Sequence, residues 1–271
     1  MNFYVREPRL GALCCALVCA FAFCPPAQAQ DAGITYLSTA NGLRPWQAIG
    51  VSDDGSVVVG NWEFIWSPSG GLGVLGNGGG ELAGVSADGR TVAGTQNGYA
   101  FRWTAQTGKV SLGGLPGGGS SFTRGISRDG STVVGEADDG TTTQAFRWTQ
   151  TSGMVALGML SGDQTSSAWA VSGDGSVVVG NSYWNGGGED HNHAFRWSEA
   201  TGMVDLGMLN NGPHASATGV SADGSVVVGW ANDGAAPRQN RRAFRWTQAT
   251  GMVGLGVLRE GRSSQAQAVS G

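Results

Sequence analysis

An eleven-residue segment recurs five times along this chain, and that recurrence limits the possible folds more than any other feature of the sequence. The copies occupy residues 50–60, 84–94, 125–135, 170–180 and 219–229, and a sixth begins at Ala268. Self-similarity at a regular spacing is typical of a stacked or radial array of one small structural unit. The sequence therefore predicts a repeat protein before any single residue is considered.

Each repeat contains four segments with the character of β-strands. Ala-x-Gly-Val-Ser comes first, and an Asp-Gly turn joins it to Ser-Val-Val-Val-Gly, whose unbroken valine run is typical of a strand buried on both faces. Ala-Phe-Arg-Trp and Met-Val-x-Leu-Gly complete the unit. Aspartate in such a turn accepts backbone hydrogen bonds, and glycine adopts a positive φ without steric cost. We expect this turn-forming role for Asp54, Asp88, Asp129, Asp174 and Asp223.

Four short antiparallel strands in roughly 40 to 50 residues match the blade of a β-propeller. We predict an all-β, propeller-like array of four-stranded blades, with five full repeats, a partial first unit at 34–38 and a partial last unit at 268–271. A β-solenoid is the alternative architecture. Phenylalanine and tryptophan of the third segment share one strand face, so we expect the tryptophans to pack between blades. These residues are Trp66, Trp103, Trp148, Trp197 and Trp246.

The N-terminal segment 1–29 has the order of a secretory signal peptide. Arg6 and Arg9 precede the apolar run 11–23, and the small-residue pattern 27–29 predicts cleavage after Ala29. The run is shorter than the about 20 residues that span a bilayer, so a retained anchor is only the alternative. We expect an exported protein, in the periplasm, at the cell surface or outside the cell. Residues 30–271 form the repeat domain, which we expect to continue beyond Gly271.

All four cysteines (Cys14, Cys15, Cys19 and Cys24) lie in that leader. The mature chain therefore lacks disulfides, thiolate nucleophiles and zinc–sulfur sites. Charged residues make up only 13% of the chain and the net charge is −4, which argues against nucleic acid as a partner. No serine stands in a nucleophile-elbow context. We predict no cofactor, no membrane span in the mature chain and no enzymatic activity.

The Ala-Phe-Arg-Trp segment resembles that of the HAF-repeat family of bacterial extracellular proteins, named for His-Ala-Phe. The literal triplet occurs at His193-Ala194-Phe195, and Tyr99, Gln144 and Arg242 take the place of the histidine in other repeats. The resemblance covers nearly the whole mature chain. It implies export and residence in the periplasm or at the surface, and in some members a C-terminal autotransporter barrel, which would here have to follow Gly271. It implies no known reaction.

The connection between the second and third segments varies most from repeat to repeat. It grows from 61–63 to 181–193 and 230–242, and in a propeller these connections emerge on one face. Aromatic side chains with polar neighbours suit contacts with carbohydrate or protein. We therefore predict a binding or surface-display module whose loop-borne contact face contains Trp62, Tyr99, Tyr183, Trp184 and Trp230. Unconstrained variation of exposed loops explains the same pattern without a ligand.

Three further groups of residues could bind an ion instead of having a purely structural role. His191 and His193 lie on one side of an extended segment and are candidate ligands for a transition metal. The turn aspartates offer one dependable carboxylate each, whereas calcium needs several oxygen ligands, so a turn role is favoured over calcium binding. We expect the repeated arginines to pair with carboxylates or carbonyl groups between blades, a role favoured over binding an anion in a central channel. They are Arg102, Arg147, Arg196 and Arg245.

Two other functions remain open on the sequence. One is a glycan hydrolase of the propeller type, with an acid and a base drawn from loop carboxylates. The carboxylates available for it are Glu136, Asp138, Asp139, Asp163, Glu189 and Asp190. The other is a purely structural autotransporter passenger with no small ligand.

Overall fold

The computed structural model describes residues 4–6, 34–36, 47–76, 79–186, 189–236, 240–258 and 261–270. Within them, five antiparallel sheets of four strands follow one another along the chain, and in each sheet the strands pair in sequence order. The predicted all-β array of four-stranded blades is confirmed. Apart from β1 (Tyr4–Arg6), the predicted leader 1–29 lies outside the described residues.

Blades 1 and 2 contain the first eight strands of the array and one short 3-10 helix. Blade 1 consists of β3 (Ala48–Val51), β4 (Val58–Gly60), η1 (Asn61–Glu63), β5 (Phe64–Ser67) and β6 (Gly71–Val74). Blade 2 consists of β7 (Glu81–Val85), β8 (Thr91–Gln96), β9 (Tyr99–Thr104) and β10 (Gly108–Gly113).

Blades 3 to 5 repeat the same order with longer second and third strands. Blade 3 consists of β11 (Ser121–Ile126), β12 (Thr132–Asp138), β13 (Thr143–Thr149) and β14 (Gly153–Gly158). Blade 4 consists of β15 (Thr165–Val171), β16 (Val177–Gly186), β17 (Glu189–Ser198) and β18 (Gly202–Asp205). Blade 5 consists of β19 (Ala215–Val220), β20 (Val226–Asn232), β21 (Arg241–Thr247) and β22 (Gly251–Gly254).

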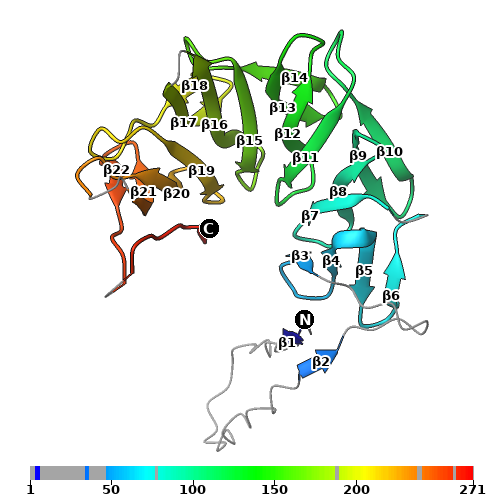
Figure 1. Cartoon of the computed structure of the whole chain (residues 1–271). Coiled ribbons are helices and arrows are strands. Elements are labelled where there is room, and N and C mark those ends of the chain that lie inside the picture. Colours follow the sequence, from blue (N-terminus) through cyan, green and yellow to red (C-terminus); the bar gives the residue numbers. More distant parts are fainter. Residues whose placement is uncertain are drawn as a thin grey trace, which may run out of the picture.

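The blades stand side by side in an arc (Figure 1). The first strand of each blade, β3, β7, β11, β15 or β19, lies at the inner edge, and neighbouring first strands contact each other. Residues 261–270 lie against blade 5, where Ser264 accepts from the Ala243 N–H at 2.9 Å and donates to Gly256 at 2.5 Å. Ser121 and Ser166 make the equivalent bonds. Ser264 thus takes the place of a first-strand serine, although no strand is assigned in residues 261–270, and the predicted last unit at 268–271 stays a prediction.

The predicted partial first unit lies elsewhere. Its residues 34–36 form β2 (Ile34–Tyr36), which pairs antiparallel with β1 and with no blade.

Phenylalanine, more than tryptophan, fills the space between blades. Phe101, Phe146, Phe195 and Phe244 are buried to within a few per cent, each packed with side chains of the preceding blade. The tryptophan two residues later is only half-buried at the edge of the same cluster in every repeat. The second strand's valines are enclosed on both faces, as predicted, because each blade is covered by a neighbour.

The repeated arginines connect consecutive blades. Arg102 Nε donates to the Gly130 carbonyl at 3.3 Å, Arg147 Nε to Gly175 at 2.9 Å, and Arg196 to Gly224 at 3.3 Å. Each acceptor is the glycine of the next blade's Asp-Gly turn. Arg245, in blade 5, is exposed. The predicted structural role between blades is confirmed for the three arginines that have a following blade in the structure.

The Asp-Gly turns have one geometry throughout. In the first, Ser52 and the Ser56 N–H donate to Asp54 at 2.7 and 2.9 Å, and the Val57 N–H donates to Ser52 at 2.9 Å. The same serine–aspartate bond occurs in all five turns. These bonds lower the pKa of Asp54 to about 2, because hydrogen bonds from Ser52 and then Ser56 stabilise the ionised carboxylate. The predicted turn-forming role is confirmed.

Among the described residues, most of the long connection of blade 4 and both ends of that of blade 5 are paired strands. β16 and β17 pair without a register shift from Val177↔Ser198 to Gly186↔Glu189, and β20 and β21 pair as far as Asn232↔Arg241. The prediction that the contact residues of 181–193 are borne by a loop is therefore wrong, because they lie on paired strands. Aromatic residues such as Tyr183 and Trp184 favour strands even where glycine is abundant nearby.

Candidate functional site

The hairpin β16–β17 carries the richest group of aromatic and ionisable side chains. Trp184 pairs directly with His191 across the hairpin, and their rings stack with centroids 5.4 Å apart and planes at 24°. The His191 and His193 rings, on the same face of β17, are 6.2 Å apart. Tyr183 lies on the other face, where burial and then a hydrogen bond to Asp190 raise its pKa. We call Trp184, His191 and His193, together with Trp230 and Arg241 of blade 5, the hairpin face; Tyr183 is not part of it.

The fold brings all three histidines of the chain into one region. His214 lies in the segment between blades 4 and 5 and forms a bridge with Asn192, between the other two histidines. Burial, and then the charge of His191, lower the pKa of His214. His193 Nδ1 is 3.2 Å from the Asp163 carboxylate. In the described part of the chain, however, no three His, Cys, Asp or Glu side chains are arranged to hold a metal ion.

Blade 5 adds a second ring to the hairpin face. The Arg241 guanidinium lies over the Trp230 ring at 3.9 Å from its centroid. Both tryptophans of this face are half-exposed, and each has a fixed neighbour on one side. A ring whose orientation is already fixed loses little conformational freedom when a ligand stacks on its open side.

The other two predicted contact residues lie at a distance along the array. Trp62 of blade 1 is 67% exposed and has φ 62°, a left-handed conformation that is uncommon for a bulky residue. Tyr99 of blade 2 is 43% exposed at the start of β9. Trp62 and Tyr99 follow the second strand of their blade, whereas Trp184 and Trp230 lie near the end of theirs, so the predicted residues share one end of the blades. The five predicted contact residues are distributed over four blades.

Several of the candidate hydrolase carboxylates are held by structural partners. Glu136 contacts Arg124 at 2.6 Å and accepts from Ser167, which lies in the next blade. Asp139 accepts from the Thr141 and Thr142 N–H groups at 2.8 Å, which places it in a tight turn. Asp163 is bound to His193, and Asp138 to the Gly140 N–H. The side chain of Glu189 lies outside the described residues.

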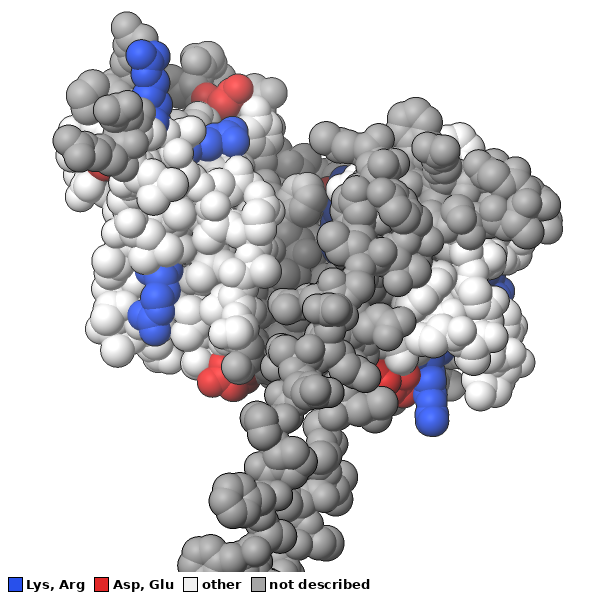
Figure 2. Space-filling model, turned by 90° about the horizontal axis from the view of Figure 1, so that it is seen from below, with Lys and Arg blue, Asp and Glu red and all other residues white. Residues whose placement is uncertain are grey.

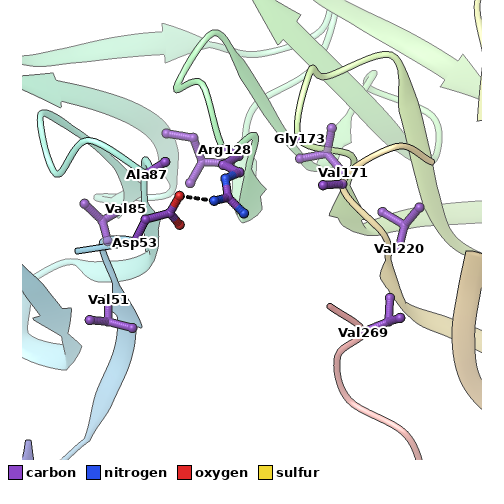
Figure 3. A pocket seen from close by; sticks show the side chains of 11 residues that line it. Val51, Asp53, Val85, Ala87, Arg128, Val171, Gly173, Val220 and Val269 are labelled. Carbon is purple, nitrogen blue, oxygen red and sulfur yellow. Dashed lines mark ion pairs between the residues drawn. The ribbon is translucent and has the colours of Figure 1, made fainter. Parts of the chain in front are cut away.

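A cavity of about 240 Å³ lies at the opposite end of the blades, where the inner strands enter their Asp-Gly turns (Figure 3). Aliphatic residues at one repeat position form its wall, and the residue two positions later in each repeat forms its rim. The wall contains Val51, Val85, Ile126, Val171, Val220 and Val269. The rim contains Asp53, Ala87, Arg128, Gly173 and Ala222. We call this cavity the channel pocket.

The rim of the channel pocket is fixed by hydrogen bonds between blades. The Asp53 N–H donates to Ala87 at 3.0 Å, and the Ala87 N–H donates to Arg128 at 2.7 Å. The Gly173 N–H donates to Ala222 at 2.9 Å. One ion pair crosses this rim, between Arg128 of blade 3 and Asp53 of blade 1 (Figure 3). The sequence interpretation missed this pair, although the rim position is the one variable residue inside the repeated Ser-x-Asp-Gly turn.

A second variable position lies in the middle of each inner strand. All five inner strands contain a β-bulge there, at Ile49, Ala83, Arg124, Trp169 and Thr218. In blades 3 and 4 these residues meet, with the Arg124 guanidinium 4.8 Å from the Trp169 ring centroid. Bulges re-aim side chains and are frequent beside binding sites. The sequence shows this position only as the x of Ala-x-Gly-Val-Ser.

Charged residues are sparse in this chain, at 13% of the sequence. Figure 2 shows mainly uncharged atoms in the described part of this view, with separate basic and acidic side chains. Among the described residues, no helix is long and apolar enough to cross a membrane.

Comparisons with known proteins support the fold. No family model and no curated protein matches the chain. Among solved structures, it is similar to TolB from Acinetobacter baumannii, with a TM-score of 0.50 and 14% identity over 81% of this chain and 55% of that one. It is also similar to a TolB described as putative from Agrobacterium tumefaciens, with a TM-score of 0.50 and 15% identity over 83% of this chain and 84% of that one. The chain thus spans about half the length of the first of these proteins, and the likeness defines it as a β-propeller-like protein.

Proposed function

We propose that this protein is an exported, non-enzymatic binding module of the HAF-repeat type, which contacts a glycan through the hairpin face. The single observation that carries this proposal is the pair of half-exposed tryptophans, Trp184 and Trp230, each held on one side by His191 or Arg241. A flat aromatic surface flanked by hydrogen-bonding groups suits the apolar face and hydroxyl rim of a sugar ring. The leader-like segment 1–29 supports export and residence at the cell surface or in the periplasm.

A glycan array probed with the fluorescently labelled protein tests this proposal. We expect Trp184→Ala and Trp230→Ala each to weaken binding by at least about tenfold, since an aromatic anchor in a contact contributes 1 to 2 kcal/mol or more. Phe122→Ala is the matched control, because Phe122 is a 41% exposed aromatic residue on the inner strand of blade 3, outside the hairpin face. Equal binding by wild type and both tryptophan variants would show that the hairpin face does not bind the glycan. Binding to immobilised protein but to no glycan would reassign the ligand class.

A further inference from the structure

The channel pocket differs from the hairpin face in shape and charge. Its wall is uniformly aliphatic, and two of the residues that line it are charged, Asp53 and Arg128. The pocket therefore combines a hydrophobic ring with one anionic and one cationic group at its rim.

The other rim positions carry only small residues beside these two charges. Asp53 belongs to blade 1 and Arg128 to blade 3, and the intervening blade contributes only Ala87. Gly173 lies on the far side of the pocket from this pair (Figure 3), and the next rim residue, Ala222, is small as well. The side chains of Arg128 and Asp53 are 56% and 44% exposed. Water solvates both ions of such an exposed pair, so the pair itself contributes little to stability and is readily exchanged for other partners.

The size of the cavity limits the ligand. At about 240 Å³, the pocket is smaller than the roughly 300–1,000 Å³ that enclose a drug-sized molecule. A compact molecule with opposite charges a few bonds apart and a short aliphatic group would match every feature at once. Its anionic end would take the Arg128 guanidinium, which suits carboxylates because it offers paired N–H donors.

We propose that the channel pocket binds a free aliphatic α-amino acid, with its carboxylate on Arg128, its ammonium group on Asp53 and its side chain against the valine ring. The ligand separates the ion pair by inserting between its two members, so each charge of the rim keeps an opposite partner. This site is independent of the hairpin face and lies at the other end of the blades.

Isothermal titration calorimetry with leucine tests this assignment. We expect leucine to bind, and N-acetyl-leucine and leucinamide to bind at least about tenfold more weakly, because each lacks one charge of the zwitterion. Glycine, which lacks the side chain, should also bind more weakly. N-acetyl-leucine that bound as well as leucine would overturn the proposal, and so would the absence of any heat with leucine.

Two variants locate the binding. Arg128→Gln and Asp53→Asn should each abolish leucine binding, whereas Arg90→Gln should leave it unchanged, because Arg90 is an 83% exposed arginine near the Asp-Gly turn of blade 2 that does not line the pocket. Leucine binding that survived both rim variants would place the ligand elsewhere. Trp184→Ala should not alter leucine binding, so failure of this site and failure of the hairpin face are distinguishable.

Discussion

Blades 3 and 4 meet through side chains that every repeat supplies, whereas their exposed edges carry side chains that differ from blade to blade. Phe195 and Arg147 lie in the interface and have counterparts in the other interfaces. Arg128 and Trp184 lie at opposite ends of the same two blades and have no equivalent elsewhere in the array. In this chain, residues that recur in every repeat pack the blades together, whereas residues that vary at a structurally equivalent position form the surfaces open to a ligand.

The largest effect should come from the repeated phenylalanine. Phe195→Ala should cost about 3–5 kcal/mol, since the ring is completely buried between blades 3 and 4 and its removal leaves a cavity. Trp197→Ala should cost less, about 1–3 kcal/mol, because that ring is only half-buried. Urea unfolding of both variants measures the difference. A larger loss of unfolding free energy for Trp197→Ala than for Phe195→Ala would show that the tryptophan, and not the phenylalanine, is the main packing residue of the interface.

One residue that varies between repeats is nevertheless buried and contributes to packing between blades. Glu63, in the short connection of blade 1, is completely enclosed, and Lys109 Nζ of blade 2 lies 2.5 Å from its carboxylate. Lys109→Met should cost about 3–5 kcal/mol by leaving a buried charge without its partner. The double variant with Glu63→Gln should recover much of the loss in the same unfolding experiment. No recovery would show that the lysine stabilises the interface by packing alone.

The arginine connection between blades should have an intermediate effect. Arg147→Met removes the bond to the Gly175 carbonyl and should cost about 1–3 kcal/mol. Arg245→Met is the control within the same repeat position, since Arg245 is exposed, and should change the stability by no more than about 0.5 kcal/mol. Thermal unfolding of the two variants compares them, and equal shifts in Tm would contradict a role for the carbonyl bond.

Acid should weaken the Asp-Gly turns together. The pKa values of Asp54, Asp174 and Asp223 are about 2 in the folded protein, against an ordinary value of 3.8. Their stabilising contribution is therefore complete above pH 3.8 and declines as the pH falls toward 2. Tm should fall across that window, and Asp174→Asn should flatten the decline. A Tm independent of pH between 4 and 2 would show that these bonds are equally strong in the unfolded chain.

The smallest effect on stability should come from the hairpin face. Trp184→Ala should change the free energy of unfolding by about 1 kcal/mol or less, because the ring is half-exposed near the end of the β16–β17 hairpin. Chemical denaturation checks this, with Phe195→Ala as the reference for a large loss. A loss above about 3 kcal/mol would place Trp184 among the packing residues and weaken its assignment to a contact face.

The sequence by itself determined the blades, because their information is local and repeated. Asp-Gly turns, valine runs and Phe-x-Trp alternation each specify strand, turn and face over a few residues, and five copies reinforce one another. The same repetition predicted that Arg147 and its counterparts would find partners between blades. The sequence does not show which of two residues on one strand face points deeper into the interface, so the prediction that the tryptophans fill it was only partly right.

Only the tertiary structure decided which residues of different repeats meet. Asp53 and Arg128 are distant in the sequence and belong to blades that are not neighbours, so the curvature of the array alone brings them together. His214 joins His191 and His193 for the same kind of reason, since the segment between blades 4 and 5 lies beside the hairpin. Local patterns specify strands and turns, whereas the candidate sites arise from side chains that the radial arrangement brings close in space.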